Sequence, residues 1–295
     1  MLKIARTEQR PVHHRKFRPL PFCFAFILLA LALGCSRTAE QPATTTANND
    51  PDQLLRQMSE KLAQAKNLSF KVERKLDAAL VEGRNIPESS VIEISVSRPG
   101  KFHAKSDSPD NARQIFFDGQ TLSIYDQTMK LYAAAPVVGT IDEAVAKIDK
   151  IYGFTPPLAE FILSDPYGAL SKQFKTRAYK GTENIAGVEC HHVSLSADEA
   201  DSELWIGTAD LMPRKLVASF KNREGNPQLQ AVFSSWNLAP TLDEKMFTFV
   251  AAKDVEKIEM ITEAQMKETA AKDSDGPASA NPQKSATPVT RKKGA

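Results

Sequence analysis

The close spacing of strand-like segments constrains the fold of this chain most strongly. Between residues 69 and 134, short β-rich runs follow one another with only turn residues between them. The segment Phe117-Asp118-Gly119-Gln120-Thr121 is typical of a hairpin, because Asp-Gly readily adopts the positive φ angles of a tight turn. Connections this short join antiparallel neighbours, since a parallel crossover needs about a dozen residues or more. The sequence therefore predicts an antiparallel sheet.

Helices are expected before the strands and between two sets of them. Apolar residues recur at helical spacing after Asp50, and again from Thr140 to Leu170. Strands return between 176 and 237, and a further short strand is expected at 247–250. Runs of strands with segregated helices indicate an α+β fold, and a long antiparallel sheet curls. We expect an open antiparallel half-barrel with an N-terminal helix and an inserted helical lid.

The N-terminal segment has the pattern of a secretory signal. Residues 1–20 carry six basic residues against one acid, and Phe22–Leu33 are twelve consecutive apolar residues. That run is shorter than the roughly 20 residues needed to cross a membrane. Leu31-Ala32-Leu33-Gly34-Cys35 resembles a bacterial lipobox, in which cleavage precedes a diacylated cysteine, although ordinary signal cleavage nearby is the alternative. Ser36 resembles the default for sorting to the outer membrane, so we expect a periplasmic lipoprotein, attached at Cys35 to the outer membrane.

Composition divides the chain into four parts. We expect a signal peptide at 1–34, a lipid-anchored flexible tether at 35–50, a half-barrel domain at 51–271 and a disordered tail at 272–295. Without the signal peptide, 32 Lys and Arg face 35 Asp and Glu, which changes the net charge from +2 to −3. A chain of this charge has no electrostatic footprint for nucleic acid, so we expect no nucleic-acid partner.

Several motifs in serial order resemble an uncharacterised family of predicted periplasmic proteins. These motifs are Gly139-Thr140-Ile141-Asp142, Ser164-Asp165-Pro166-Tyr167, Gly187-Val188-Glu189-Cys190-His191-His192-Val193, Glu203-Leu204-Trp205-Ile206, Pro213-Arg214-Lys215-Leu216-Val217 and Phe233-Ser234-Ser235-Trp236-Asn237-Leu238. That family is similar in fold to the outer-membrane lipoprotein carrier and receptor group (LolA-like and LolB-like), which includes the RseB-like regulator of envelope stress. The resemblance covers about residues 52–262. It implies an open half-barrel with a hydrophobic cavity, which takes acyl chains in the carriers.

Ten apolar residues are candidates for the cavity and its lid. They are Ile141, Val145, Ile148, Leu158, Phe161, Ile162, Trp205, Phe220, Phe233 and Trp236. The alternative is that these side chains simply fill the core, as aromatic residues usually do.

The triplet Cys190-His191-His192 is the most reactive-looking motif. Successive strand residues point to opposite faces, so Cys190 and His192 share a face that excludes His191. A metal site needs at least a third ligand, and we expect a structural cysteine beside hydrogen-bonded imidazoles. No catalytic, metal-binding or cofactor-binding residue is therefore predicted, and an enzyme using Cys190 and His192 is the less favoured alternative.

The predicted function is non-covalent binding of a hydrophobic or lipidated ligand by a membrane-anchored protein. The expected partners are the membrane, through acylated Cys35, and a lipid, an acyl chain or a lipoprotein. The alternative from another class is a protein-interaction or envelope-sensing module that holds no ligand. The sequence makes no prediction of the ligand's identity or of the oligomeric state.

Overall fold

The computed structural model describes residues 49–81, 86–109, 111–153, 156, 158–262 and 264–265. All of them belong to one compact unit. The predicted signal peptide, Cys35, most of the tether at 35–50 and the tail at 272–295 lie outside the described residues.

Twelve strands form one sheet in the described part of the chain. Their bounds are β1 (Asn67–Leu76), β2 (Glu88–Ser97), β3 (Lys101–Asp107), β4 (Arg113–Phe117), β5 (Thr121–Asp126), β6 (Leu131–Pro136), β7 (Thr176–Ile185), β8 (Val188–Ser196), β9 (Ala200–Gly207), β10 (Pro213–Phe220), β11 (Gln228–Asn237) and β12 (Glu256–Ile258). The spatial order is β12-β6-β5-β4-β3-β2-β1-β11-β10-β9-β8-β7. Every pair is antiparallel except β12 with β6. Strands β12 and β7 end the sheet and do not pair, so the predicted open antiparallel half-barrel is confirmed.

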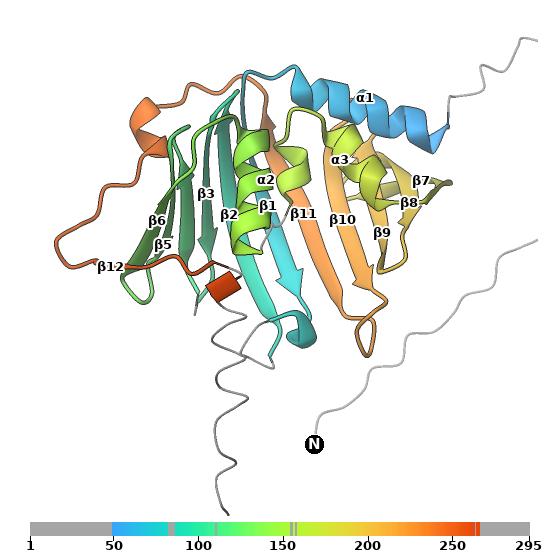
Figure 1. Cartoon of the computed structure of the whole chain (residues 1–295). Helices are drawn as coiled ribbons and strands as arrows, with labels where there is room; N and C mark the ends of the chain where they lie inside the picture. Colours follow the sequence, from blue (N-terminus) through green and yellow to red (C-terminus); the bar gives the residue numbers. More distant parts are fainter. Residues whose placement is uncertain are drawn as a thin grey trace, which may run out of the picture. The chain divides into compact units, whose positions relative to one another are not determined.

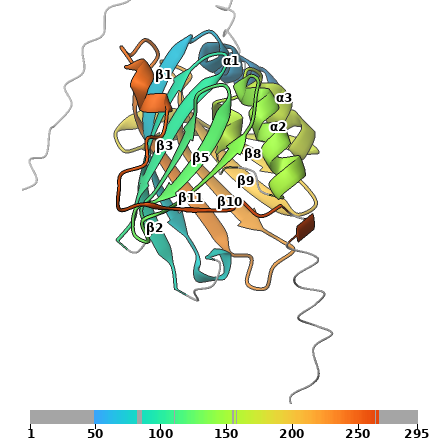
Figure 2. The same cartoon turned by 60° about the vertical axis from the view of Figure 1, so that its left-hand side comes forward.

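Three α-helices lie on the same face of this sheet (Figure 1). They are α1 (Pro51–Ala63), α2 (Ile141–Tyr152) and α3 (Pro166–Gln173), accompanied by the short 3-10 helices η1 (Ala78–Leu80), η2 (Ala159–Phe161) and η3 (Glu244–Phe247). Figure 2 shows the curved strands with α2 and α3 on their concave side. The α+β architecture with an N-terminal helix and an inserted helical lid is thus confirmed. None of the described helices is long and apolar enough to cross a membrane.

Side-chain caps explain where the helices begin. The Asp50 carboxylate accepts a hydrogen bond from the backbone N–H of Asp52 at 3.1 Å, immediately before α1. Thr140 and Glu143 form a reciprocal capping box at the start of α2. Asp165 caps α3 by accepting from the backbone N–H of Gly168 at 2.8 Å. These local signals determine the residue at which each of the three helices begins.

Strand alternation separates the two faces of the sheet. In β1, Leu68, Phe70 and Val72 are buried beneath the helices, whereas Lys71 and Glu73 are exposed on the other face. We call the helix-covered side the inner face and the opposite side the outer face. The predicted hairpin is also present, because β4 and β5 pair across a turn in which Gly119 has a φ of 93°.

The prediction of a strand at 247–250 is wrong. Phe247 ends η3 and is buried, and the chain beyond it continues without pairing until β12. Phe249 packs instead against the outer-face rings of Phe116, Tyr125 and Tyr132, with centroid distances of 5.0–5.4 Å. The alternating apolar residues in this segment therefore serve packing, not strand pairing.

Candidate functional site

A solid core fills much of the inner face. Ile141 and Ile148 of α2 are fully buried against the sheet. The ring of Phe161 meets Phe233 edge-on, with centroids 5.0 Å apart. The indole of Trp236, from β11, stacks on Phe70 with centroids 4.2 Å apart. Side chains from the lid and the sheet therefore interdigitate here, as in an ordinary protein interior.

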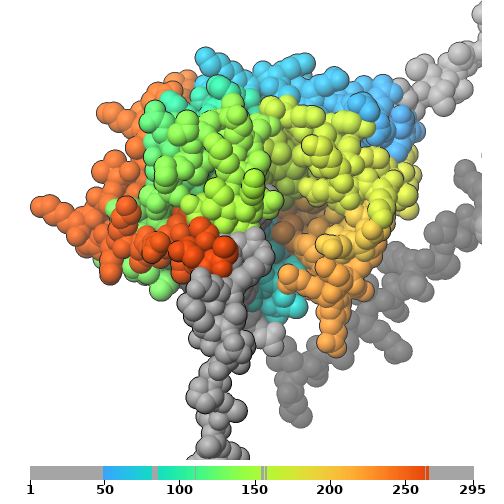
Figure 3. Space-filling model, viewed as in Figure 1, coloured from blue at the N-terminus to red at the C-terminus, as the bar shows by residue number. Residues whose placement is uncertain are grey.

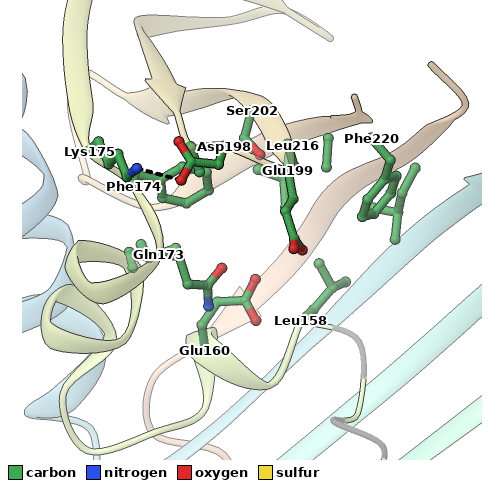
Figure 4. Close-up of a pocket in the computed structure, with 15 residues that line it drawn as sticks. Leu158, Glu160, Gln173, Phe174, Lys175, Asp198, Glu199, Ser202, Leu216 and Phe220 are labelled. Atoms are coloured by element: carbon green, nitrogen blue, oxygen red, sulfur yellow. Dashed lines mark hydrogen bonds and ion pairs between the residues drawn. The ribbon is translucent and has the colours of Figure 1, made fainter. Parts of the chain in front are cut away.

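A cavity of about 550 Å³ remains at one end of the same face. It lies between the segment 158–175 and strands β9, β10 and β11 (Figure 4). The space-filling view shows a hollow below the lid and beside these strands (Figure 3). The lining residues are Leu158, Glu160, Leu170, Gln173, Phe174, Lys175, Ala197, Asp198, Glu199, Ala200, Ser202, Leu216, Ala218, Phe220 and Leu229.

The floor of the cavity follows from the two-residue period of a strand. Leu216, Ala218 and Phe220 are alternate residues of β10, so all three point to the inner face. Ala218 pairs with Leu229 of β11, which lines the cavity beside it. The small Ala218 side chain leaves space that the larger neighbours surround. The floor is therefore apolar.

The roof is formed by residues 158–173, which we call the roof segment. Leu158 and Leu170 supply its apolar surface over the cavity. Leu158 has a φ of 66°, in the left-handed region that a leucine rarely adopts. Such backbone strain is found preferentially at ligand sites and moving segments. The strain here lies at the point where the roof begins.

Polar groups gather on one side of the cavity. The ammonium of Lys175 forms an ion pair with Asp198. In Figure 4 the Glu160 carboxylate points toward the amide of Gln173, and Glu199 reaches toward the same space from the turn before β9. Burial raises the pKa of Glu160. The cavity thus combines apolar walls with a carboxyl group for which ionisation is costly.

Side-chain contacts tie the roof segment to the other helices. The Tyr167 backbone N–H donates to the hydroxyl of Ser59 in α1 at 2.9 Å. The guanidinium of Arg56 lies 3.8 Å from the centre of the Tyr167 ring. Ser164 donates through its hydroxyl to Asp142 of α2 at 2.8 Å. Both neighbouring helices therefore position the roof.

The structure brings together only some of the predicted site residues. Leu158 and Phe220 line the cavity. The core beside it contains Ile141, Val145, Ile148, Phe161, Ile162 and Phe233, and Trp236 packs against this core. Phe233 and Trp236 also line a separate pocket of about 310 Å³. Sequence reasoning missed Leu216 and Ala218, although their spacing from Phe220 in a predicted strand already places all three on one face.

Trp205 does not face the lid, contrary to the prediction. Its neighbours Leu204 and Ile206 belong to the inner core, so the alternation of β9 turns the indole to the outer face. There it stacks on His192 with ring centroids 4.4 Å apart, and Lys215 lies over its ring. The indole N–H donates to Glu183 at 2.7 Å. These contacts bury Trp205 on the outer face, and its side chain does not line the cavity.

The Cys190 motif has the facing predicted from the sequence. His192 lies on the outer face, whereas His191 pairs with the Tyr179 hydroxyl on the inner face at 3.2 Å. Cys190 is a free, fully buried cysteine, and burial raises the pKa of its thiol. Its Sγ donates to the carbonyl of Val188 at 3.4 Å. A buried thiol with a raised pKa is poorly suited to act as a nucleophile.

No metal-binding cluster of three or more His, Cys, Asp or Glu side chains is found among the residues that the structure describes.

The fold is an open half-barrel whose helical roof covers a cavity with an apolar floor. The chain belongs to the DUF2092 family of predicted periplasmic proteins, whose model matches residues 51–261. This match confirms the resemblance inferred from the serial motifs. No curated protein matches the sequence significantly.

Solved structures with a similar arrangement share little sequence with this chain. A LolA superfamily protein from Nitrosomonas europaea is 9% identical, with 66% of this chain and 97% of that chain covered and a TM-score of 0.33. The lipoprotein LppX from Mycobacterium tuberculosis is 10% identical, with coverages of 66% and 100% and a TM-score of 0.38. The MucA/MucB complex of Pseudomonas aeruginosa gives 15% identity, coverages of 68% and 61% and a TM-score of 0.38. At these TM-scores, the likenesses assign neither a ligand nor a function to this chain.

Proposed function

We propose that this protein is a periplasmic lipoprotein that binds a hydrophobic or lipidated molecule non-covalently in the cavity beneath the roof segment. The observation that carries the proposal is the cavity of about 550 Å³ with an apolar floor and roof. Its volume falls within the range of about 300–1,000 Å³ typical of small-molecule sites. Filling it with an apolar group contributes about 25 cal/mol for each Å² removed from water.

Ligand exchange in this proposal occurs when the roof segment opens locally. The contacts between the roof and helices α1 and α2 include hydrogen bonds from the hydroxyl groups of Tyr167 and Ser164. A short segment held in this way opens at a lower free energy than the strands beneath it. Ligand enters while the roof is displaced and is enclosed when the side-chain contacts re-form.

A protein-interaction role is the second candidate, and the free edge of β7 favours it. This ten-residue strand ends the sheet and pairs only with β8 among the described strands. An unpaired edge offers backbone groups to an added strand. In that case a polypeptide, not a lipid, accompanies the protein.

A substitution that fills the cavity tests whether the cavity is the ligand site. The chain from residue 36 onward contains the whole compact unit that begins at residue 46, so it can be secreted behind a cleavable signal and purified. Native mass spectrometry then compares wild type with Ala218→Phe, which places an aromatic ring in the cavity. The matched control is Val217→Phe, which adds the same ring to the neighbouring residue on the outer face.

We expect a lipid-sized adduct on wild type and Val217→Phe, and a loss of at least about tenfold in its occupancy on Ala218→Phe. Melting temperatures of the three proteins establish that each is folded. An adduct of equal occupancy on all three overturns the cavity as the ligand site. A stoichiometric polypeptide in place of lipid overturns lipid binding and supports the second candidate.

Anchoring at Cys35 has its own test, because the proposal for the cavity does not depend on it. The full-length chain is expressed in cells fed an alkyne-tagged fatty acid and then compared with Cys35→Ala. Label on wild type that is absent from the variant supports acylation at Cys35. Equal labelling, or none on either protein, overturns it.

A further inference from the structure

The charged groups around the cavity do not balance. Its lining includes three carboxylates, from Glu160, Asp198 and Glu199, and one ammonium, from Lys175. Lys175 is already engaged by Asp198 in an ion pair. Glu160 and Glu199 therefore place two further carboxyl groups on the polar side of the cavity, and each adds a negative charge when it ionises.

Two cations of the neighbouring elements pair with other carboxylates. Lys221 donates to Asp201 at 2.8 Å, and Arg177 lies 3.5 Å from Asp52. The Glu160 carboxyl is surrounded by the apolar lining and by the neutral amide of Gln173 (Figure 4). The backbone N–H of Glu160 itself forms a hydrogen bond that lowers the pKa of this carboxyl group, in opposition to its burial. A partly buried carboxyl group is stabilised when a further donor reaches it, and a ligand can supply that donor.

We propose that the cavity selects amphiphiles whose polar end donates hydrogen bonds and carries no negative charge, with Glu160 as the acceptor of that polar end. This inference rests on the proposed function. The apolar chain of the ligand lies against Leu216, Ala218 and Phe220 of the floor. Its ammonium or hydroxyl group lies toward Glu160 and Glu199. A carboxylate or phosphate head at the same place meets Glu199, and Glu160 once it is ionised, and is disfavoured by like-charge repulsion.

The experiment uses three probes with the same twelve-carbon chain: dodecylammonium, dodecanol and dodecanoate. Each is titrated at neutral pH into the chain from residue 36, below the micelle-forming concentration of the two ionic probes and below the solubility limit of dodecanol, with displacement of a neutral fluorescent apolar dye as the readout. We expect dodecylammonium to bind at least about tenfold more tightly than dodecanoate, because a charge-assisted hydrogen bond replaces a repulsive contact. Dodecanol is expected to lie between them.

Variants assign this preference to a residue. Glu160→Gln is expected to reduce the ratio of the two affinities by about tenfold, whereas Glu160→Asp retains the charge and the order of preference. Glu73→Gln is the matched control, because Glu73 is exposed on the outer face of β1. Glu199→Gln is measured in parallel, and a ratio that changes only in this variant overturns the assignment to Glu160.

The outcomes separate this inference from the function on which it rests. If none of the three probes displaces the dye from wild type, the proposed function fails. If all three bind equally, or dodecanoate binds most tightly, the cavity is a ligand site and the proposed selectivity is overturned. An unchanged ratio in Glu160→Gln likewise overturns the role of Glu160.

Discussion

The hydroxyl of Tyr167 donates a hydrogen bond to the carboxylate of Asp52 at 2.8 Å, which joins α3 to α1. The same hydroxyl accepts from the guanidinium of Arg56 at 2.6 Å. These contacts hold the pKa of Asp52 below its ordinary value, with the Tyr167 hydrogen bond as the largest cause. One phenolic oxygen therefore connects the roof of the cavity to the N-terminal helix.

Replacing Tyr167 with phenylalanine is expected to loosen the roof segment. The substitution keeps the ring and removes the hydroxyl, so the free energy of unfolding should fall by about 1 kcal/mol. Hydrogen exchange at residues 166–173 should accelerate more than exchange at α2. Tyr152→Phe is the control, since it removes a hydroxyl from the other lid helix. Equal acceleration in both variants would contradict a specific role for Tyr167.

The largely buried carboxyl group of Glu160 predicts a pH-dependent effect on stability. Because burial raises its pKa in the folded state, the folded protein retains the proton to a higher pH than the unfolded chain does. Stability is therefore lost as the pH rises from the ordinary value of 4.5 through the raised pKa. Glu160→Gln abolishes this loss, so its stability relative to wild type should increase as the pH rises above the ordinary value of 4.5. Urea titrations across this range measure it, and a constant difference would contradict the prediction.

The Cys190 thiol is expected to react slowly in the native protein. In the chain from residue 36 onward Cys190 is the only cysteine, and it is fully buried. Ellman's reagent should therefore modify it at a rate limited by opening of the fold, at least about a hundredfold more slowly than in urea. Comparable rates under native and denaturing conditions would favour the enzyme alternative.

Phe249 is expected to hold the C-terminal segment on the outer face. Its ring lies near Tyr132, Tyr125 and Phe116, and β12 begins seven residues later beside β6. Phe249→Ala should destabilise the fold by about 2 kcal/mol, less than the cost of about 3–5 kcal/mol at a fully buried site, because the ring is half-buried. Val250→Ala is the control, since this neighbouring side chain is 82% exposed. Thermal unfolding of both variants measures the difference, and equal losses would contradict the packing role.

Local signals in the sequence predict much of the fold. Each of these signals depends only on residues that are close in the sequence. They are the caps at Asp50 and Thr140, the Asp118-Gly119 turn and the alternation of apolar residues. The pairing of β1 with β11 joins segments about 160 residues apart, and no local pattern specifies it. The strand at 256–258 was missed because its three residues are exposed and lack alternation.

The cavity could not be located by the same reasoning. Alternation places Leu216, Ala218 and Phe220 on one face, but it does not say which part of that face the lid fills. That depends on how the volumes of Phe161, Phe233 and their neighbours fit together, which is a property of the packed structure. The same limit applies to Trp205, because aromatic character does not reveal to which face a residue points.

In the part of the chain that the structure describes, the backbone-to-backbone hydrogen bonds of the roof segment run from Ala159 with Pro156 to Phe174 with Leu170 and reach no strand. The ladder of the sheet is independent of these bonds. Substitutions over 158–173 can therefore reshape the chamber while every strand keeps its register. Evolution can therefore adapt such a scaffold to ligands of another size by changing the sequence of the roof segment alone, while the sheet beneath it stays the same.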